Sequence, residues 1–263
     1  MAKSPQSTAL ASGHNITKAV TITSPDGVEA GIVAAAGGNA ITISAGSNDA
    51  IVLRGLTLNG GGTGSNGVVF NSGAGLTVTN CAIQNFTITG DQTTGNGILI
   101  APSVGAVTFV ITNTLIANNR YVGIFYRPPS GSTTANGIID HVVATANEDG
   151  AEFDLRNAAG GQLVAAVSNS TFGVNAFAGI GVSNGPSSIV TVTMDNVKAI
   201  SNNNYGVGAF DTAKIVLSHS VITGNGVGAN NQTSSNSFYS YQDNRINDNV
   251  TNISSVLNTV APQ

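Results

Sequence analysis

The chain has 263 residues, of which Lys and Arg contribute 9 and Asp and Glu contribute 13, so only 8% of its residues are charged. Globular proteins average about 25% charged residues, and the low fraction here excludes coiled coils and highly charged disordered chains. The formal net charge is −4 and the nine cations are scattered singly. Because nucleic-acid-binding proteins carry clustered basic residues, we expect no nucleic-acid partner.

Glycine and asparagine are abundant, with 33 Gly and 31 Asn residues. Both residue types favour tight turns and left-handed backbone, which predicts many short strands rather than long helices. The longest uncharged stretch, residues 157–194, is interrupted by Gly, Asn, Ser and Thr, so we expect no membrane-spanning helix. Residues 1–12 contain no apolar core segment, so we expect no signal peptide in this chain.

From residue 110 onward the sequence repeats a short apolar strand, an Asn-rich turn, a glycine and a second short strand. One Asn recurs at intervals of 23 to 28 residues, at Asn119, Asn147, Asn175, Asn202, Asn225 and Asn249. A polar or acidic residue six or seven places earlier recurs with it, at Asn113, Asp140, Asn169, Asp195, His219 and Asp243. This period, with short β segments and no helical pattern, predicts one coil of a parallel β-solenoid.

In such a solenoid Val, Ile, Leu, Ala and Phe point inward, Thr, Ser and Asn point outward, and successive coils lie ~4.8 Å apart. We expect the recurrent Asn residues to adopt a left-handed backbone conformation and their side chains to hydrogen-bond from coil to coil. Earlier coils begin near Ile16, Ile51 and Leu76, which gives about eight or nine coils in one domain. His141 and His219 lie at or beside the turn, which favours a structural role, and Cys81 is expected to pack as a small apolar side chain.

We expect residues 1–15 to form a short lead-in, residues 16–235 the β-helix, and residues 236–263 a C-terminal coil and cap. Exposed end coils are unpaired sheet edges and require covering. Phe238, Tyr239 and Tyr241 are candidates for the C-terminal cap. The segment before the first strand is too short for a cap helix, so we expect this end to be truncated or covered by another copy of the chain, as in a homo-oligomer.

The repeat, written as strand, Asn-Ser/Thr-x-Ile-x-x-Asn and Gly-Ile/Val, resembles the β-helix proteins of the pectin-lyase-like superfamily. Segments 48–60 and 137–144, together with residues 238–241 and 257–261, resemble a group of bacterial β-helix repeat proteins. The resemblance covers nearly the whole chain and implies an all-β, single-stranded right-handed parallel β-helix (solenoid) of about eight or nine coils. It also implies a secreted or cell-surface protein that acts on acidic polysaccharides.

Five of the 13 acidic residues fall within one 15-residue window, at Asp140, Glu148, Asp149, Glu152 and Asp154. In segment 150–156, alternation places Ala151, Phe153 and Leu155 inward and Glu152, Asp154 and Arg156 outward. Alignment of Gly123 with Gly150 puts Phe125 beside Glu152 and Arg127 beside Asp154, with Gly181 and Ser183 on the next coil. The two carboxylates would share one face about 7 Å apart.

The candidate catalytic residues are therefore Arg127, Glu152 and Asp154, and the candidate substrate-binding residues are Phe125, Arg156 and Tyr121. A lyase would use the carboxylates to hold Ca²⁺ against a uronate, through Asp149, Glu152 and Asp154, while Arg assists proton removal. Without calcium we expect no metal or cofactor. A hydrolase would need an acid and a base on either side of the glycosidic bond, whereas Arg127 and Ser183 flank Asp154.

Three functions remain open at this point. A secreted or surface scaffold that binds carbohydrate or is structural accounts for the solenoid and for the lack of a complete catalytic set. A polysaccharide lyase or glycoside hydrolase acting on acidic polysaccharides through Arg127, Glu152 and Asp154 is the alternative, so enzymatic activity is left undecided. Outward Thr residues could also form a flat ladder suited to ice or crystal surfaces, although it breaks at residues 165–167 and at Val216.

Overall fold

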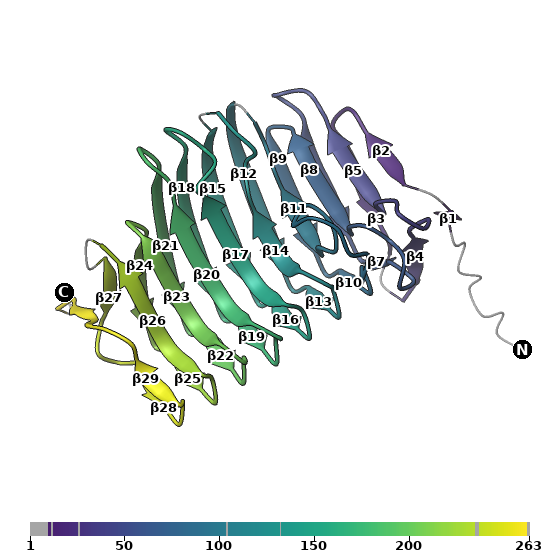
Figure 1. Cartoon of the computed structure of the whole chain (residues 1–263). Helices are drawn as coiled ribbons and strands as arrows, with labels where there is room; N and C mark the ends of the chain where they lie inside the picture. Colours follow the sequence, from purple (N-terminus) through teal and green to yellow (C-terminus); the bar gives the residue numbers. More distant parts are fainter. Residues whose placement is uncertain are drawn as a thin grey trace, which may run out of the picture.

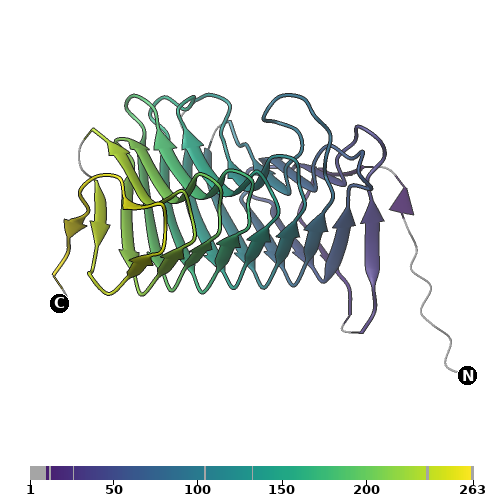
Figure 2. The ribbon, with the colours of Figure 1, turned by 60° about the horizontal axis from the view of Figure 1, so that its bottom comes forward.

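The computed structural model describes residues 10–11, 13–25, 27–103, 105–131, 133–234 and 237–261. The chain forms a parallel β-solenoid of about nine turns, in agreement with the eight or nine coils that we predicted. Each coil adds one strand to each of three ten-stranded sheets, which run the length of the rod (Figures 1 and 2). No helix occurs in the described part of the chain.

Strands of the first sheet are, in spatial order, β1 (Leu10–Ala11), β4 (Ala30–Val33), β7 (Leu56–Asn59), β10 (Ala82–Gln84), β13 (Leu115–Ala117), β16 (Val143–Thr145), β19 (Thr171–Gly173), β22 (Lys198–Ile200), β25 (Val221–Thr223) and β28 (Arg245–Asn247). Those of the second sheet are β2 (His14–Ile16), β5 (Ile41–Ser44), β8 (Val68–Ser72), β11 (Ile98–Ile100), β14 (Val122–Tyr126), β17 (Asp149–Leu155), β20 (Ala178–Asn184), β23 (Tyr205–Asp211), β26 (Val227–Thr233) and β29 (Thr251–Ile253).

The third sheet consists of β3 (Val20–Thr23), β6 (Ala50–Arg54), β9 (Gly75–Thr79), β12 (Gly105–Thr112), β15 (Thr133–Asp140), β18 (Gln162–Ser168), β21 (Ile189–Asp195), β24 (Lys214–Ser218), β27 (Phe238–Ser240) and β30 (Asn258–Thr259). Strands therefore begin inside the expected lead-in, and residues 1–9 of that segment lie outside the described residues. At the other end, Phe238 is fully buried and three further strands follow β27.

The core is one continuous apolar stack inside the three sheets. Ala151, Phe153 and Leu155 of β17 are all 0% exposed and belong to this stack, which confirms the predicted alternation. Cys81 is buried in the same stack, as expected. Burial of such aliphatic and aromatic side chains, at roughly 25 cal/mol per Å² of apolar surface, is the main favourable term for this fold.

The predicted Asn ladder is present at the corner between the first and second sheets. Asn202 donates its backbone and side-chain N–H groups to Oδ1 of Asn225, at 2.9 Å each, and the same pair of bonds joins Asn175 to Asn202 at 3.1 and 2.9 Å. The contacts continue from Asn119 to Asn249 through Asn147, Asn175, Asn202 and Asn225. These buried bonds satisfy turn amides that no sheet neighbour can reach.

One detail of this ladder differs from our prediction. The left-handed residue is the one before each ladder Asn, at Asn118, Ala146, Val174, Ser201, Gly224 and Asp248. The positive φ of this residue turns the side chain of the following Asn inward, where it can hydrogen-bond to the Asn of the next coil.

The second predicted ladder combined two register positions. Asp140 and Asp195 align with Ser168, whereas His141, Asn169 and His219 occupy the next position and have φ of 46° to 53°. In each of these coils the two positions lie seven and six residues before the ladder Asn, and the polar residues chosen from the sequence came from both. An additional ladder through Asn39, Asn66 and Asn96 was not predicted.

Candidate functional site

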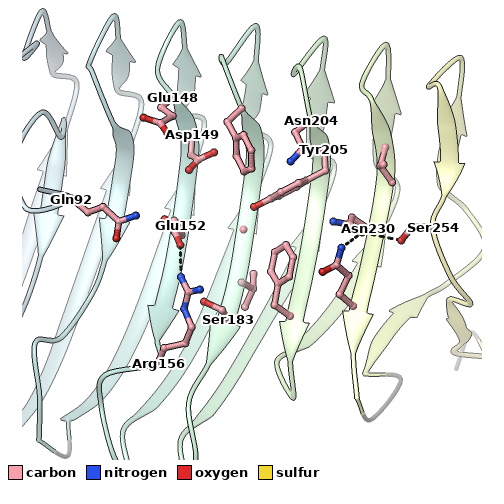
Figure 3. A pocket seen from close by; sticks show the side chains of 16 residues that line it. Gln92, Glu148, Asp149, Glu152, Arg156, Ser183, Asn204, Tyr205, Asn230 and Ser254 are labelled. Carbon is pink, nitrogen blue, oxygen red and sulfur yellow. Dashed lines mark hydrogen bonds and ion pairs between the residues drawn. The ribbon is translucent and has the colours of Figure 1, made fainter. Parts of the chain in front are cut away.

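A groove with a volume of about 660 Å³ crosses the outward face of the second sheet over β17, β20, β23 and β26 (Figure 3). We call it the central groove. Its polar lining includes the carboxyl groups of Glu148, Asp149 and Glu152 and the side-chain amides of Gln92, Asn204, Asn230 and Gln232. Its aromatic lining is Phe177, Tyr205 and Phe210.

Two outward-facing glycines shape the floor of the central groove. Gly181 of β20 pairs with Glu152 on one side and with Gly208 of β23 on the other. A Cβ atom at Gly181 would lie 3.0 Å from the Tyr205 hydroxyl, and a Cβ atom at Gly208 would lie 2.7 Å from Cε2 of the Tyr205 ring. Without side chains at these two positions, the Tyr205 ring can lie against the sheet.

The three aromatic rings form a connected row. Tyr205 meets Phe177 edge-on with ring centroids 5.6 Å apart, and it meets Phe210 with centroids 5.5 Å apart. Such edge-to-face pairs fix ring orientation. The groove therefore has an ordered apolar side next to its polar floor.

Glu152 lies where the sequence placed it, between Phe125 on the preceding coil and Gly181 on the next. Its Oε1 accepts a hydrogen bond from Arg156 at 3.3 Å. Burial raises the pKa of Glu152 to about 7, with a further increase from the charge of Asp154 that Arg156 and Arg127 partly oppose. Glu152 is therefore half-protonated near neutral pH.

Asp149, at the start of β17, is more strongly perturbed. Burial raises the pKa of its carboxyl to about 8, and the nearby Glu152 and Glu148 charges add to the effect. Its Oδ1 atom is buried and has no hydrogen-bond partner among the described residues. Two neighbouring carboxyl groups of the central groove thus hold protons at a pH where exposed carboxyl groups do not.

Asp154 differs from both of these carboxyl groups because hydrogen-bond donors surround its oxygen atoms. Its carboxylate accepts hydrogen bonds from the backbone N–H, Nε and NH2 of Arg156 at 2.9 to 3.0 Å and from Ser183 Oγ at 3.3 Å. Arg127 Nε lies 3.9 Å from Oδ2, as the sequence alignment predicted. Burial alone would raise the pKa of Asp154, but the bonds and charge of Arg156 outweigh it and lower the pKa.

The other predicted residues lie under the segment that precedes β11, outside the central groove. Phe125 is 0% exposed and packs against Val69, Leu99 and Val122, so its ring is not open to solvent. Arg127 lies over that ring, 5.4 Å from its centroid, and donates a hydrogen bond to Gln92.

Tyr121 donates to the Gly90 carbonyl at 3.1 Å. Together with Arg127 it lines a second pocket, of about 430 Å³. Glu152 and Arg156 line the central groove, whereas Phe125, Arg127 and Tyr121 do not line it.

The sequence placed Phe210 near the acidic coil, but sequence reasoning missed the other groove residues from the later coils, chiefly Tyr205, Asn204 and Asn230. Their signal was the pair of Gly-x-Gly segments at residues 179–181 and 206–208, which align with Glu152 in the sheet. Small residues in register on an outward face leave room for a ligand.

The outward face of the third sheet carries no continuous Thr ladder. One column of residues in register runs through Thr21, Val52, Thr77, Val110, Ile138, Ala166, Thr193 and Val216. Aliphatic side chains occupy five of the eight positions in this column, three of them in succession from Val110 to Ala166. The periodic hydroxyl array that an ice-like lattice would match is therefore interrupted more often than the sequence suggested.

No group of three or more His, Cys, Asp or Glu residues in the described ranges is arranged to hold a metal ion. Asp149, Glu152 and Asp154, which we named for Ca²⁺, thus do not converge on one point. Nor does the described part of the chain contain a helix that is long and apolar enough to span a membrane.

Comparison of the chain with protein-family models, curated proteins and solved structures finds no match in any of the three.

Proposed function

We propose that the protein is a carbohydrate-binding β-solenoid that holds an oligosaccharide chain in the central groove, without breaking it. The observation that carries this proposal is the combination of a row of three aromatic rings with amide and carboxyl groups along four successive coils. Sugar rings present apolar C–H faces and polar hydroxyl edges, so they need both kinds of surface at once. We extend the proposal to a location outside the cell or at its surface, where such polymers occur.

The length of the groove supports a chain-like ligand. The lining comes from β17, β20, β23 and β26, and Ser254 beyond β29 lies at one end. Since coils are ~4.8 Å apart, four coils span roughly 15 Å between the outer strands. This length accommodates about three sugar units.

Binding without catalysis is favoured by the state of Asp154. A hydrolase needs one carboxylate that is free to act as a base or nucleophile beside a protonated acid. Asp154 is only 2% exposed and is occupied by Arg156, Ser183 and Arg127. We therefore assign Asp154 and Arg127 to positioning the groove rather than to chemistry.

Glycoside hydrolysis remains the second candidate because of one observation. The pKa of Glu152 is raised to about 7, which suits a general acid at neutral pH. In this case Asp149 would be the partner carboxyl group. Because burial also raises the pKa of Asp149, to about 8, Asp149 would be ionised, and so could act as the base beside Glu152, only at alkaline pH.

The test is a titration of the protein with defined oligosaccharides by isothermal calorimetry, with product analysis of the same mixtures. We expect binding without release of reducing ends or unsaturated products. Phe210→Ala should weaken binding about tenfold, which corresponds to ~1.4 kcal/mol. Tyr239→Ala is the matched control, because Tyr239 is a partly exposed aromatic residue on β27 outside the groove.

Equal affinity of the Phe210→Ala variant and the wild type would contradict the proposed binding site. Release of reducing ends that depends on Glu152 would replace the binding function by the hydrolase. If no oligosaccharide binds at all, the proposed function is wrong.

A further inference from the structure

One oxygen of the Asp149 carboxyl group lacks a hydrogen-bond donor, although the backbone N–H of Ala178 donates to the carboxyl group. Its buried Oδ1 has no partner among the described residues, and no Lys, Arg or His in the same ranges forms an ion pair with it. The charged groups that act on it are the carboxylates of Glu148 and Glu152. A buried carboxyl oxygen without a donor is costly, and native structures retain such a group chiefly at functional sites.

Tyr205 offers an unused hydroxyl at the same place. The side chain is only 7% exposed, and its hydroxyl forms no hydrogen bond within the described part of the chain. Its ring is held by Phe177 and Phe210, so the hydroxyl is directed across Gly181 toward the strand that carries Asp149 and Glu152 (Figure 3). A buried tyrosine normally finds a partner for this group. Here the space in front of it is the central groove.

The charges that line the groove are unbalanced. Glu148, Asp149 and Glu152 face Arg156, whose guanidinium makes its shortest contacts to Asp154, at 2.9 and 3.0 Å. Glu148 is paired with Arg120 at 3.4 Å, near the groove rim. A uronate would raise the pKa of these carboxyl groups further, whereas a cation would stabilise their ionised forms, so the excess of acidic groups favours a cation over a uronate.

We propose that the central groove binds an amine-bearing sugar, such as the glucosamine units of a deacetylated polysaccharide, with its ammonium group between Asp149, Glu152 and the Tyr205 hydroxyl. An ammonium group has three N–H donors, and these three side chains supply three acceptors. The inference deepens the proposed function and rests on it, since it names the class of sugar that the groove selects.

The physical reason for selectivity is the pairing of the ammonium charge with the carboxyl groups of the groove. Binding an ammonium group in the groove would favour the ionised carboxylates of Asp149 and Glu152, because a nearby opposite charge stabilises the charged form of an acid. Charge-assisted hydrogen bonds of this type are about twice as strong as neutral ones. An acetylated sugar presents a neutral amide at the same position and gains no ion pair.

The experiment compares three tetrasaccharides by isothermal calorimetry at pH 6 in ~150 mM salt, a concentration that screens long-range attraction. They are the tetramers of glucosamine, of N-acetylglucosamine and of galacturonate. We expect the glucosamine tetramer to bind at least tenfold more tightly than the N-acetylated one, and the galacturonate tetramer not to bind measurably.

Asp149→Asn and Tyr205→Phe should remove this preference while leaving the weaker binding of the N-acetylated tetramer in place. Glu29→Gln is the matched control, because it removes one exposed carboxylate away from the groove and should keep the preference. Thermal unfolding of each variant shows that it is folded. Glu152→Gln repeats the test should Asp149→Asn fail to fold.

Two results would overturn the inference and leave the proposed function standing. One is equal or tighter binding of the N-acetylated tetramer, and the other is an unchanged preference in both Asp149→Asn and Glu152→Gln. Failure of all three tetramers and of neutral oligosaccharides to bind would instead remove the proposed function together with the inference.

Discussion

Asp154 and Arg156 are joined by three hydrogen bonds of 2.9 to 3.0 Å although only one residue separates them in the sequence. Arg156 also reaches Glu152, so one guanidinium connects two carboxyl groups on the outward face of β17. This arrangement makes the two acids unequal. One is an ionised structural anchor, and the other is a weak acid that faces the central groove.

Replacement of Arg156 by Ala should destabilise the protein by about 1–3 kcal/mol. The change leaves the buried Asp154 carboxylate with the backbone N–H of residue 156, Ser183 and the more distant Arg127 as its remaining partners. We place the value below the 3–5 kcal/mol typical of fully buried pairs, because the Arg156 side chain is 52% exposed. Urea unfolding at pH 7 measures the effect. Arg245→Ala, an exposed arginine on β28, is the control and should cost less than ~0.5 kcal/mol.

The stabilisation that Asp154 provides should depend on pH in the acidic range. Its folded-state pKa is lowered, so its contribution is fully present above the unfolded pKa near 3.8 and is lost as pH falls through the folded value. The difference in stability between wild type and Asp154→Asn should therefore be largest near neutral pH and should shrink below about pH 4. A difference that stays constant from pH 7 to pH 3 would contradict this account.

Asp149 should change the stability of the protein with pH in the opposite direction to Asp154. Its folded pKa of about 8 lies above the unfolded value of 3.8, so the proton is bound more tightly in the folded protein. Stability should then fall as pH rises from about 4 toward 8, because the folded state must pay for ionisation of a buried group. Asp149→Asn should flatten this slope and should be more stable than wild type at pH 8. Urea midpoints measured between pH 5 and 9 give the comparison.

The Asn ladder should be a major source of stability. Asn202→Ala removes the acceptor for two N–H groups of Asn175 and the donor to the Phe172 carbonyl. Because these groups are buried, we expect a loss of about 2–4 kcal/mol. Asn203→Ala, one residue later and exposed, should change stability by less than ~1 kcal/mol. Similar losses for the two variants would argue against a role of the side-chain ladder.

Val174 carries backbone strain that can be relieved. It has φ of 57°, which is unfavourable for a β-branched side chain, and its side chain is 65% exposed. Asn occupies the corresponding position on an earlier coil, at Asn118, with φ of 56°. Val174→Asn should therefore stabilise the protein by about 1 kcal/mol. Val164→Asn is the control, because Val164 is similarly exposed but lies in extended β18, where Asn should destabilise.

Gly208 should be required for binding more than for folding. A Cβ atom there would lie 2.7 Å from the Tyr205 ring and 2.9 Å from the Phe210 ring, so both rings would move. We expect Gly208→Ala to weaken oligosaccharide binding about tenfold. Gly31→Ala is the control, since the new methyl group would contact only the Thr57 carbonyl, at 4.0 Å. Unchanged affinity in the Gly208 variant would contradict the role of the ordered rings.

The solenoid could be predicted from the sequence, because each coil must repeat the same inward pattern and the same turn residues. The spacing from Asn119 to Asn249 predicted which amides bond along the rod, and alternation in β17 predicted that Phe153 is buried and that Glu152 faces outward. Register between adjacent coils even placed Phe125 beside Glu152. All of these depend on contacts between neighbouring repeats, which a periodic sequence encodes directly.

The surroundings of the outward face could not be predicted from the sequence, because they depend on contacts between side chains of different coils. Burial of Phe125 depends on the packing of Val69 and Leu99 from neighbouring coils and on Arg127 over its ring, and the groove depends on the Tyr205 ring of β23, which reaches back over Gly181. The ionisation state of each carboxyl group followed from these surroundings, since Arg156 donates three hydrogen bonds to Asp154 while the buried Oδ1 of Asp149 has no donor among the described residues. Alternation specifies the face on which a side chain lies. Its exposure and ionisation depend on long-range packing, which the repeat does not encode.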